Sequence, residues 1–253
     1  SNEIINFPKR YLSKILLIDS LLRKEFYLIK SSVKKEIDSV INLLIIGGSQ
    51  GAKVFDDELK KAIIEKFKRE NGLTFENNQI SVGAGGKQII YNAMMASINP
   101  DDEVIIPAPY WVSYPDIVLL AGGKPVIVEC SEKENFKISP KKLENAITKK
   151  TKWLILNSPS NPTGSCYTES EINSLANILN KQKHVHVLSD DIYEHIIYEN
   201  FKFFTIAQIK ELKDRTLTMN GVSKSYAMTG WRIGYAGGPK DLIKAMAKIQ
   251  SQS

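Results

Sequence analysis

The sequence has little of several features that would assign it to a class at once. Among its 253 residues are two cysteines and three histidines, and no internal repeat or low-complexity segment is present. Cys130 and Cys166 are too few for a disulfide framework and lack metal or redox spacing, which indicates unreactive thiols in a reducing compartment. His184 and His186 share one face of a predicted strand and His195 follows. No third ligand has suitable spacing, so we predict no metal site.

Long apolar runs are also missing. The longest uncharged ones, such as residues 41–46, are far shorter than the roughly 20 residues that span a bilayer, and no charged-then-apolar leader precedes them. We therefore expect a cytoplasmic protein without membrane association. The net charge of +6 comes from scattered lysines that alternate with acidic residues. This pattern is typical of solvated helix faces, so we expect no nucleic-acid partner.

Helical and strand-like segments alternate along most of the chain. Helices are predicted over 57–70 and 87–98, and strands are predicted at QISV, DEVIIP, KPVIVEC, KWLILN, HVHVLSD and TLTMNG. Such alternation predicts an α/β fold whose mostly parallel sheet is covered by helices on both faces. A ligand is then expected beyond the carboxyl ends of these strands.

Two glycine loops could hold phosphate. Residues 41–46 predict a strand that runs through Gly47, Gly48 and Gly51 into the helix at 57–70, an arrangement found at many nucleotide sites. The second loop, GAGGKQ, lacks the P-loop frame and has Gln88 where the magnesium-binding hydroxyl belongs, which argues against a nucleoside triphosphate. A glycine loop at a helix start still offers N–H groups to a single phosphate.

Aromatic and acidic residues follow two other strand ends. Trp111 lies with Tyr110 and Tyr114 in PAPYWVSYP, where packing in the core is the default interpretation and stacking on a planar ring is the alternative. Asp190 and Asp191 are adjacent, so they point to opposite sides of a strand and are poorly placed as an acid/base pair. One of them could instead face a cationic ring nitrogen.

Three further residues gain interest only together. Asn161 lies in NPTG, which turn composition alone explains. Lys224 follows an apolar strand, and it is either an exposed side chain or a buried nucleophile with a lowered pKa. Arg232 comes shortly after it.

These motifs occur in the same order as in a known protein family. GAGGKQ, PAPYWVSYP, NSPSNPTG, SDDIYEH and SKSYAMTGWRIGY resemble the class I, fold-type I aminotransferases that use pyridoxal 5′-phosphate (PLP), in particular the aspartate and aspartate/prephenate group. The resemblance covers about residues 58–253 and implies the family's large, cofactor-binding domain. It further implies a homodimer and transamination, with aspartate and 2-oxoglutarate as the expected substrates.

The resemblance also implies a role for each residue around the cofactor ring. Lys224 would form the Schiff base with PLP and carry the proton from the substrate's α-carbon. Asp190 would pair with the pyridine nitrogen and keep it protonated. Tyr193 and Asn161 would hydrogen-bond the phenolic oxygen. Trp111 would stack on the ring, and Trp111 and Asn161 would also contact the substrate.

The implied phosphate site is a glycine loop with a cation. Backbone N–H groups around Gly85, Gly86 and Lys87 would hold the phosphate at the helix start. Arg232 would act as a bidentate clamp, with Ser223 as a further donor.

Some family elements are expected to be missing. The sequence ends in the helix after RIGYAGG, so we expect no small C-terminal domain and no arginine from it for the substrate α-carboxylate. The family's N-terminal arm is not found before residue 58. A fragment that at most binds PLP and is catalytically silent is therefore an alternative to an active transaminase.

Residues 1–57 resemble a different enzyme. LLIIGGSQGAKVFDD and KILLIDSLLRKEFY are similar to segments of the peptidoglycan UDP-N-acetylglucosamine N-acetylglucosaminyltransferase. We predict a remnant segment here, because most of that enzyme's two nucleotide-binding domains is not present. A sugar-nucleotide binding module is the remaining alternative function.

Overall fold

The computed structural model describes residues 49–252. The chain divides into two compact units, Ser1–Glu58 and Leu59–Ser253. The predicted strand at 41–46, with Gly47 and Gly48, lies outside the described residues. Helix α3 (Ser49–Asn71) begins before the predicted helix at 57–70, so the prediction of a loop at Gly51 is wrong. A single glycine costs a helix only about 1 kcal/mol relative to alanine, which the helix can absorb.

Within residues 49–252, seven strands form one sheet in the order β1-β7-β6-β5-β4-β2-β3. Strands β6, β5, β4, β2 and β3 pair in parallel, whereas β7 pairs antiparallel with both β1 and β6. The prediction of a mostly parallel sheet is confirmed. The strands are β1 (Ile80–Ala84), β2 (Glu103–Ala108), β3 (Lys124–Glu129), β4 (Thr151–Asn157), β5 (His186–Asp190), β6 (Thr216–Gly221) and β7 (Ile233–Gly237).

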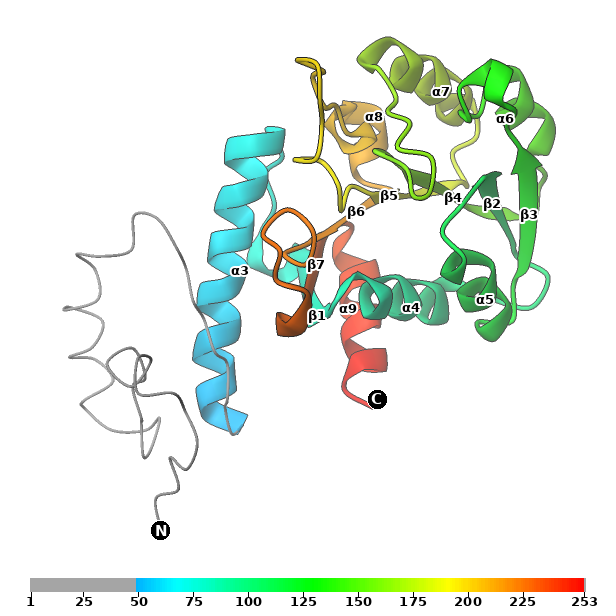
Figure 1. Cartoon of the computed structure of the whole chain (residues 1–253). Coiled ribbons are helices and arrows are strands. Elements are labelled where there is room, and N and C mark those ends of the chain that lie inside the picture. Colours follow the sequence, from blue (N-terminus) through cyan, green and yellow to red (C-terminus); the bar gives the residue numbers. More distant parts are fainter. Residues whose placement is uncertain (1–48, 253) are drawn as a thin grey trace. The chain divides into compact units, whose positions relative to one another are not determined.

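Helices cover both faces of this sheet (Figure 1). One group is α4 (Gly86–Ser97), α5 (Ser113–Leu120) and α9 (Lys240–Gln250), and the other is α6 (Pro140–Ala146), α7 (Glu169–Lys181) and α8 (Lys210–Lys213). Alternate residues of each strand enter different cores. In β4, Trp153 and Ile155 pack with the first group, whereas Leu154 and Leu156 pack with the second.

Strand β7 was not predicted. Two of its five residues are glycine, so the apolar alternation that marks a strand is weak there. Tyr235 of β7 nevertheless packs in a third core with Ile63 and Phe67 of α3 and with Phe75. The strand therefore forms through long-range contacts that its own sequence does not announce.

The parallel strands bring polar residues to one edge of the sheet. Strand β4 ends at Asn157, β5 ends at Asp190, and β6 ends at Gly221, from which the chain continues towards Lys224. Carboxyl ends of parallel strands are where α/β proteins bind ligands. Among the described helices, none is both long and apolar enough to cross a membrane.

Candidate active site

A cavity of about 210 Å³ lies at these strand ends. Every site residue predicted from the sequence lines it except Gly85, which is the N-cap of the helix that begins with the lining residue Gly86. The lining also includes residues that the sequence did not single out as site residues. The full set is Gly86, Lys87, Trp111, Tyr114, Asn157, Asn161, Asp190, Ile192, Tyr193, Met219, Ser223, Lys224, Thr229 and Arg232.

The start of α4 and Arg232 form an anion cradle. Gly85 has a φ of +87°, and a Cβ on it would lie 2.5 Å from Nη2 of Arg232, so the guanidinium sits directly against this glycine. Arg232 donates to the carbonyl oxygens of Thr229 (3.1 Å) and Ala84 (3.5 Å), and no ion pair involves it within residues 49–252. A cation without a carboxylate partner, next to the free N–H groups of a helix start, suits a phosphate.

Gly234 of β7 is a further residue on which this cradle depends. A Cβ on Gly234 would lie 2.2 Å from the carbonyl carbon of Gly85 and 2.4 Å from the nitrogen of Gly86. No side chain fits there without moving the start of α4. No local sequence pattern predicts this close approach, because it comes from the pairing of β7 with β1, which places Gly234 opposite Gly83.

Asp190 is buried at the end of β5 and has a buried tyrosine as its partner. The Tyr114 hydroxyl donates to Oδ2 of Asp190 at 2.5 Å, and the Ile192 N–H donates to Oδ1 at 3.3 Å. Burial raises the pKa of Asp190 to about 6, although both hydrogen bonds favour the charged form. The core packing predicted for Tyr114 is confirmed, and its hydroxyl adds the polar contact with Asp190 to that packing.

The Lys224 side chain is exposed, not buried, and it lines the cavity, so its amine is accessible to a molecule bound there. Its Nζ atom lies 5.8 Å from the centroid of the Tyr193 ring. Trp111 meets Tyr114 edge to face and lies 5.2 Å from the Lys87 ammonium, so its ring is held at the cavity wall. The predicted amine and aromatic residues thus line the same cavity as the buried carboxylate of Asp190.

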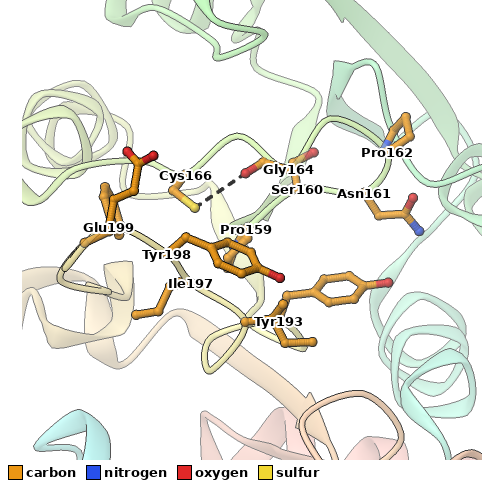
Figure 2. A pocket seen from close by; sticks show the side chains of 12 residues that line it. Pro159, Ser160, Asn161, Pro162, Gly164, Cys166, Tyr193, Ile197, Tyr198 and Glu199 are labelled. Carbon is orange, nitrogen blue, oxygen red and sulfur yellow. Dashed lines mark hydrogen bonds between the residues drawn. The ribbon is translucent and has the colours of Figure 1, made fainter. Parts of the chain in front are cut away.

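A second, larger cavity adjoins the first. It has a volume of about 580 Å³, and its walls are the loop 159–166 and the segment 193–201. Asn161 and Tyr193 line both cavities. Figure 2 shows these two side chains at one end of the larger cavity, with Cys166 and Glu199 at the other. Asn161 is fixed through its backbone N–H, which donates to Oδ1 of Asn157 at 2.8 Å.

The cysteines are both free thiols, and burial raises the pKa of each. Protonated thiols are poor nucleophiles. The histidine prediction needs one correction, because β5 begins at His186 and His184 lies before it. His184 instead forms a hydrogen bond with the carbonyl oxygen of Thr148 at 3.0 Å, so the two rings do not share a strand face.

Another group of residues has the composition of a cation site. Glu70, Glu194 and His195 each present one ligand atom within 4.8 Å of the others. Spacing could not reveal this, since Glu70 is far away in sequence. Lys66 pairs with Glu194 and lies 3.6 Å from Glu70, whose other oxygen is 2.5 Å from Arg69. These cations already neutralise the carboxylates, so we assign an ion-pair network here.

Asp191, the neighbour of Asp190, is buried but does not line the cavity. Its raised pKa leads us to predict that the stability of the protein depends on pH. Burial, followed by the charge of Glu194, raises its pKa from 3.8 to about 7, and Oδ2 has no hydrogen-bond partner within the described structure. The stability that this group contributes is complete below pH 3.8 and is lost as the pH rises through about 7. Between pH 4 and 8, the free energy of unfolding of Asp191→Asn should therefore rise by about 4 kcal/mol relative to that of the parent.

Urea unfolding of the cofactor-free parent and variant at several pH values measures this difference. Parallel curves of unfolding free energy against pH for the two proteins would contradict a raised pKa at Asp191.

The reported comparisons with known proteins all match aminotransferases. A family model described as aminotransferase class I and II matches residues 26–253, and this match begins within the segment 1–57 for which the sequence motifs predict a different origin. An aspartate/prephenate aminotransferase of Cereibacter sphaeroides is 61% identical over 197 residues, which are 78% of this chain and 49% of that protein. An aspartate aminotransferase of Rhizobium meliloti is 59% identical over 197 residues, covering 78% and 48% respectively.

Solved structures show the same relationship. The crystal structure of the aspartate aminotransferase from Rhizobium meliloti has a TM-score of 0.76 and 46% identity, covering 98% of this chain and 67% of that one. The Thermus thermophilus aspartate aminotransferase with maleate has a TM-score of 0.74 and 47% identity, covering 78% and 50%. This chain spans about half the length of the curated relatives it matches.

Proposed function

The chain belongs to the aminotransferase class I and II family, and from this premise we propose that its described residues form the PLP site of an amino-acid transaminase. The observation that carries the proposal is the composition of one cavity. It combines a buried carboxylate, an amine, aromatic walls and a helix start with an arginine. This is the donor set that a phosphorylated pyridinium aldehyde requires.

The fit to the phosphate rests on the anion cradle. Gly85 and Gly86 leave no side chain between the start of α4 and the cavity, and Arg232 brings a fixed positive charge to the same place. The hydroxyl groups of Ser223 and Thr229 line the cavity and can donate further hydrogen bonds. Arginine beside helix N–H groups binds a phosphate through several donors at once.

The fit to the ring rests on Asp190. Burial raises the pKa of Asp190, because removal from water disfavours the charged carboxylate, and an opposite charge beside it would favour that form. A protonated ring nitrogen would supply that charge, so Asp190 would hold a proton there. Tyr193 and Asn161 line the cavity and can hydrogen-bond the ring's phenolic oxygen, while Trp111 can pack against the ring.

When bound, PLP supplies an aldehyde that carries the amino group and a ring that takes up the electron pair left at the substrate's α-carbon. Lys224 would anchor the cofactor through its Nζ atom. Its amine, once released by the incoming amino acid, would move the proton from the substrate's α-carbon. Trp111 and Asn161 would also contact the substrate.

We infer that aspartate is the amino donor and 2-oxoglutarate the acceptor, because the relatives with about 60% identity are named aspartate or aspartate/prephenate aminotransferases. A homodimer is proposed on the same family basis. Because the chain matches only about half of these relatives, binding of PLP without turnover is the competing proposal. A cytoplasmic location remains a prediction from the sequence.

The proposal for residues 1–57 rests on sequence motifs alone, since nearly all of this segment lies outside the described residues. We propose that it derives from the N-acetylglucosaminyltransferase that its motifs resemble. Thermal melts with uridine diphosphate test the corresponding sugar-nucleotide function. An unchanged melting temperature would contradict it.

The transaminase proposal is tested by mixing PLP-loaded protein with aspartate and following the visible absorbance of the cofactor. We expect the band to convert to the amino form and to return when 2-oxoglutarate is added. A cofactor band that aspartate leaves unchanged would contradict transamination by this chain and favour the silent alternative. The absence of any band would overturn the PLP site as well.

A further inference from the structure

A buried charged cluster lies behind the wall of the PLP cavity, and no role in the reaction has been given to it. Its members are Lys66 and Asn71 of α3, Glu194, and Asn220 of β6, all at most 6% exposed. Lys66 forms an ion pair with Glu194 and donates to Oδ1 of Asn71 at 2.9 Å. The Glu194 carboxylate also accepts hydrogen bonds from Asn71 (2.7 Å) and Asn220 (2.6 Å).

Glu194 therefore joins three segments of the chain. It directly follows Tyr193, which lines the cavity, and it binds the side chain of Asn220 near the end of β6, from where the chain runs to Lys224. Its third connection is to α3 through Lys66. The segments that carry the cavity's tyrosine and its amine are thus linked through one carboxylate.

A second connection runs in parallel with the first. The His195 ring lies 3.0 Å from Oε2 of Glu70 on α3 and 3.3 Å from Oγ of Ser225. Ser225 is the residue after Lys224. Glu194 and His195, the two residues after Tyr193, are therefore both connected to the end of α3. Glu194 is connected through a buried ion pair, and His195 through a contact at the surface.

A buried ion pair is a costly way to hold a fold together. Removing two charges from water costs several kcal/mol per ion, and apolar replacements of such pairs are often neutral or stabilising. What a fully hydrogen-bonded pair does provide is a single arrangement of the groups around it. The arrangement here concerns Tyr193 and Lys224, whose ring centroid and Nζ atom are 5.8 Å apart.

We propose that Glu194 is a positioning residue for the PLP site, which sets the placement of Tyr193 relative to Lys224 through its buried pair with Lys66. The inference rests on the proposed function, because it assigns Tyr193 and Lys224 to the cofactor. It gives α3 a role in the site although none of the α3 side chains that the structure describes lines the cavity.

The test compares variants loaded with PLP. Glu194→Gln keeps the shape of the side chain but removes the charge that pairs with Lys66. We expect the dissociation constant of PLP to rise about tenfold and the pH midpoint of the visible band to move by at least about half a unit. Because an unpaired buried lysine can impair folding, Lys66→Met/Glu194→Gln is measured alongside, and the same two shifts are expected.

Glu171→Gln is the matched control. This variant breaks a different Lys–Glu ion pair, in which Nζ of Lys137 lies 2.6 Å from Oε1 of Glu171. Glu171 lines neither cavity. It should leave the PLP affinity and the pH midpoint as in the parent. Variants at Glu194 that fold and show the parent's midpoint and affinity would overturn the positioning role. A parent without a visible band would overturn the proposed function itself, and this inference with it.

Discussion

Replacing Lys224 with alanine is expected to lower the rate of amino-group transfer by at least about 10⁴-fold. The substitution removes the cavity amine that would both anchor the cofactor and move the proton at the substrate's α-carbon. Within residues 49–252 the Lys224 side chain has no ion pair or hydrogen bond, and the carbonyl oxygen that accepts from the Ala227 N–H (3.0 Å) is kept in the variant, so the free energy of unfolding should stay nearly unchanged. The rate is measured with aspartate and 2-oxoglutarate, and stability by urea unfolding.

Lys87 provides the control for this variant within the same cavity. Its side chain lies against Trp111, while its proposed role in phosphate binding belongs to its backbone N–H. Lys87→Met keeps that N–H, so the visible absorbance band of PLP anchored to Lys224 should remain. If Lys224→Ala retained transfer activity, or if Lys87→Met lost the chromophore instead, the anchoring amine would be assigned wrongly.

Replacing Gly234 with alanine is expected to destabilise the protein by about 3 kcal/mol. The added methyl group would lie 2.2 Å from the carbonyl carbon of Gly85, and the atoms it meets belong to the backbone, which cannot rotate away. Either β7 or the start of α4 must move. Because the start of α4 is the proposed phosphate site, PLP binding should weaken more than global stability alone explains.

Gly230 is a nearby glycine with open space around it. A Cβ there would meet no heavy atom within 4 Å, and its φ is not positive. Gly230→Ala should therefore change the free energy of unfolding by no more than about 0.5 kcal/mol. Chemical unfolding and PLP titration of the two variants form one experiment. Equal behaviour of Gly234→Ala and Gly230→Ala would show that the approach of β7 to α4 has no energetic consequence.

Periodicity predicted most of the sheet because its strands are short apolar runs between helices. Periodicity does not predict strand β7, because Gly234 and Gly237 interrupt its apolar pattern. Only its pairing with β1 and β6 identifies it as a strand. The start of α3 was misjudged for the opposite reason. Gly51 predicts a loop locally, yet the helix continues through it.

The site was predictable to the extent that it consists of strand ends. Asp190 is the last residue of β5 and Asn161 follows β4, and the carboxyl ends of parallel strands meet at one side of the sheet whatever the details of packing. Contacts between distant elements could not be predicted in this way. The partnership of Tyr114 with Asp190, the approach of Gly234 to Gly85, and the link from α3 to Glu194 all depend on how the elements pack.

The most direct test of the account is peptide mapping of the parent protein after incubation with PLP and reduction with borohydride. Reduction makes a lysine-linked cofactor permanent, so mass spectrometry can locate it. The account predicts a single pyridoxyl-phosphate label on Lys224, formed only when the protein is folded. A label spread over surface lysines, or none at all, would contradict the claim that this cavity is a PLP site.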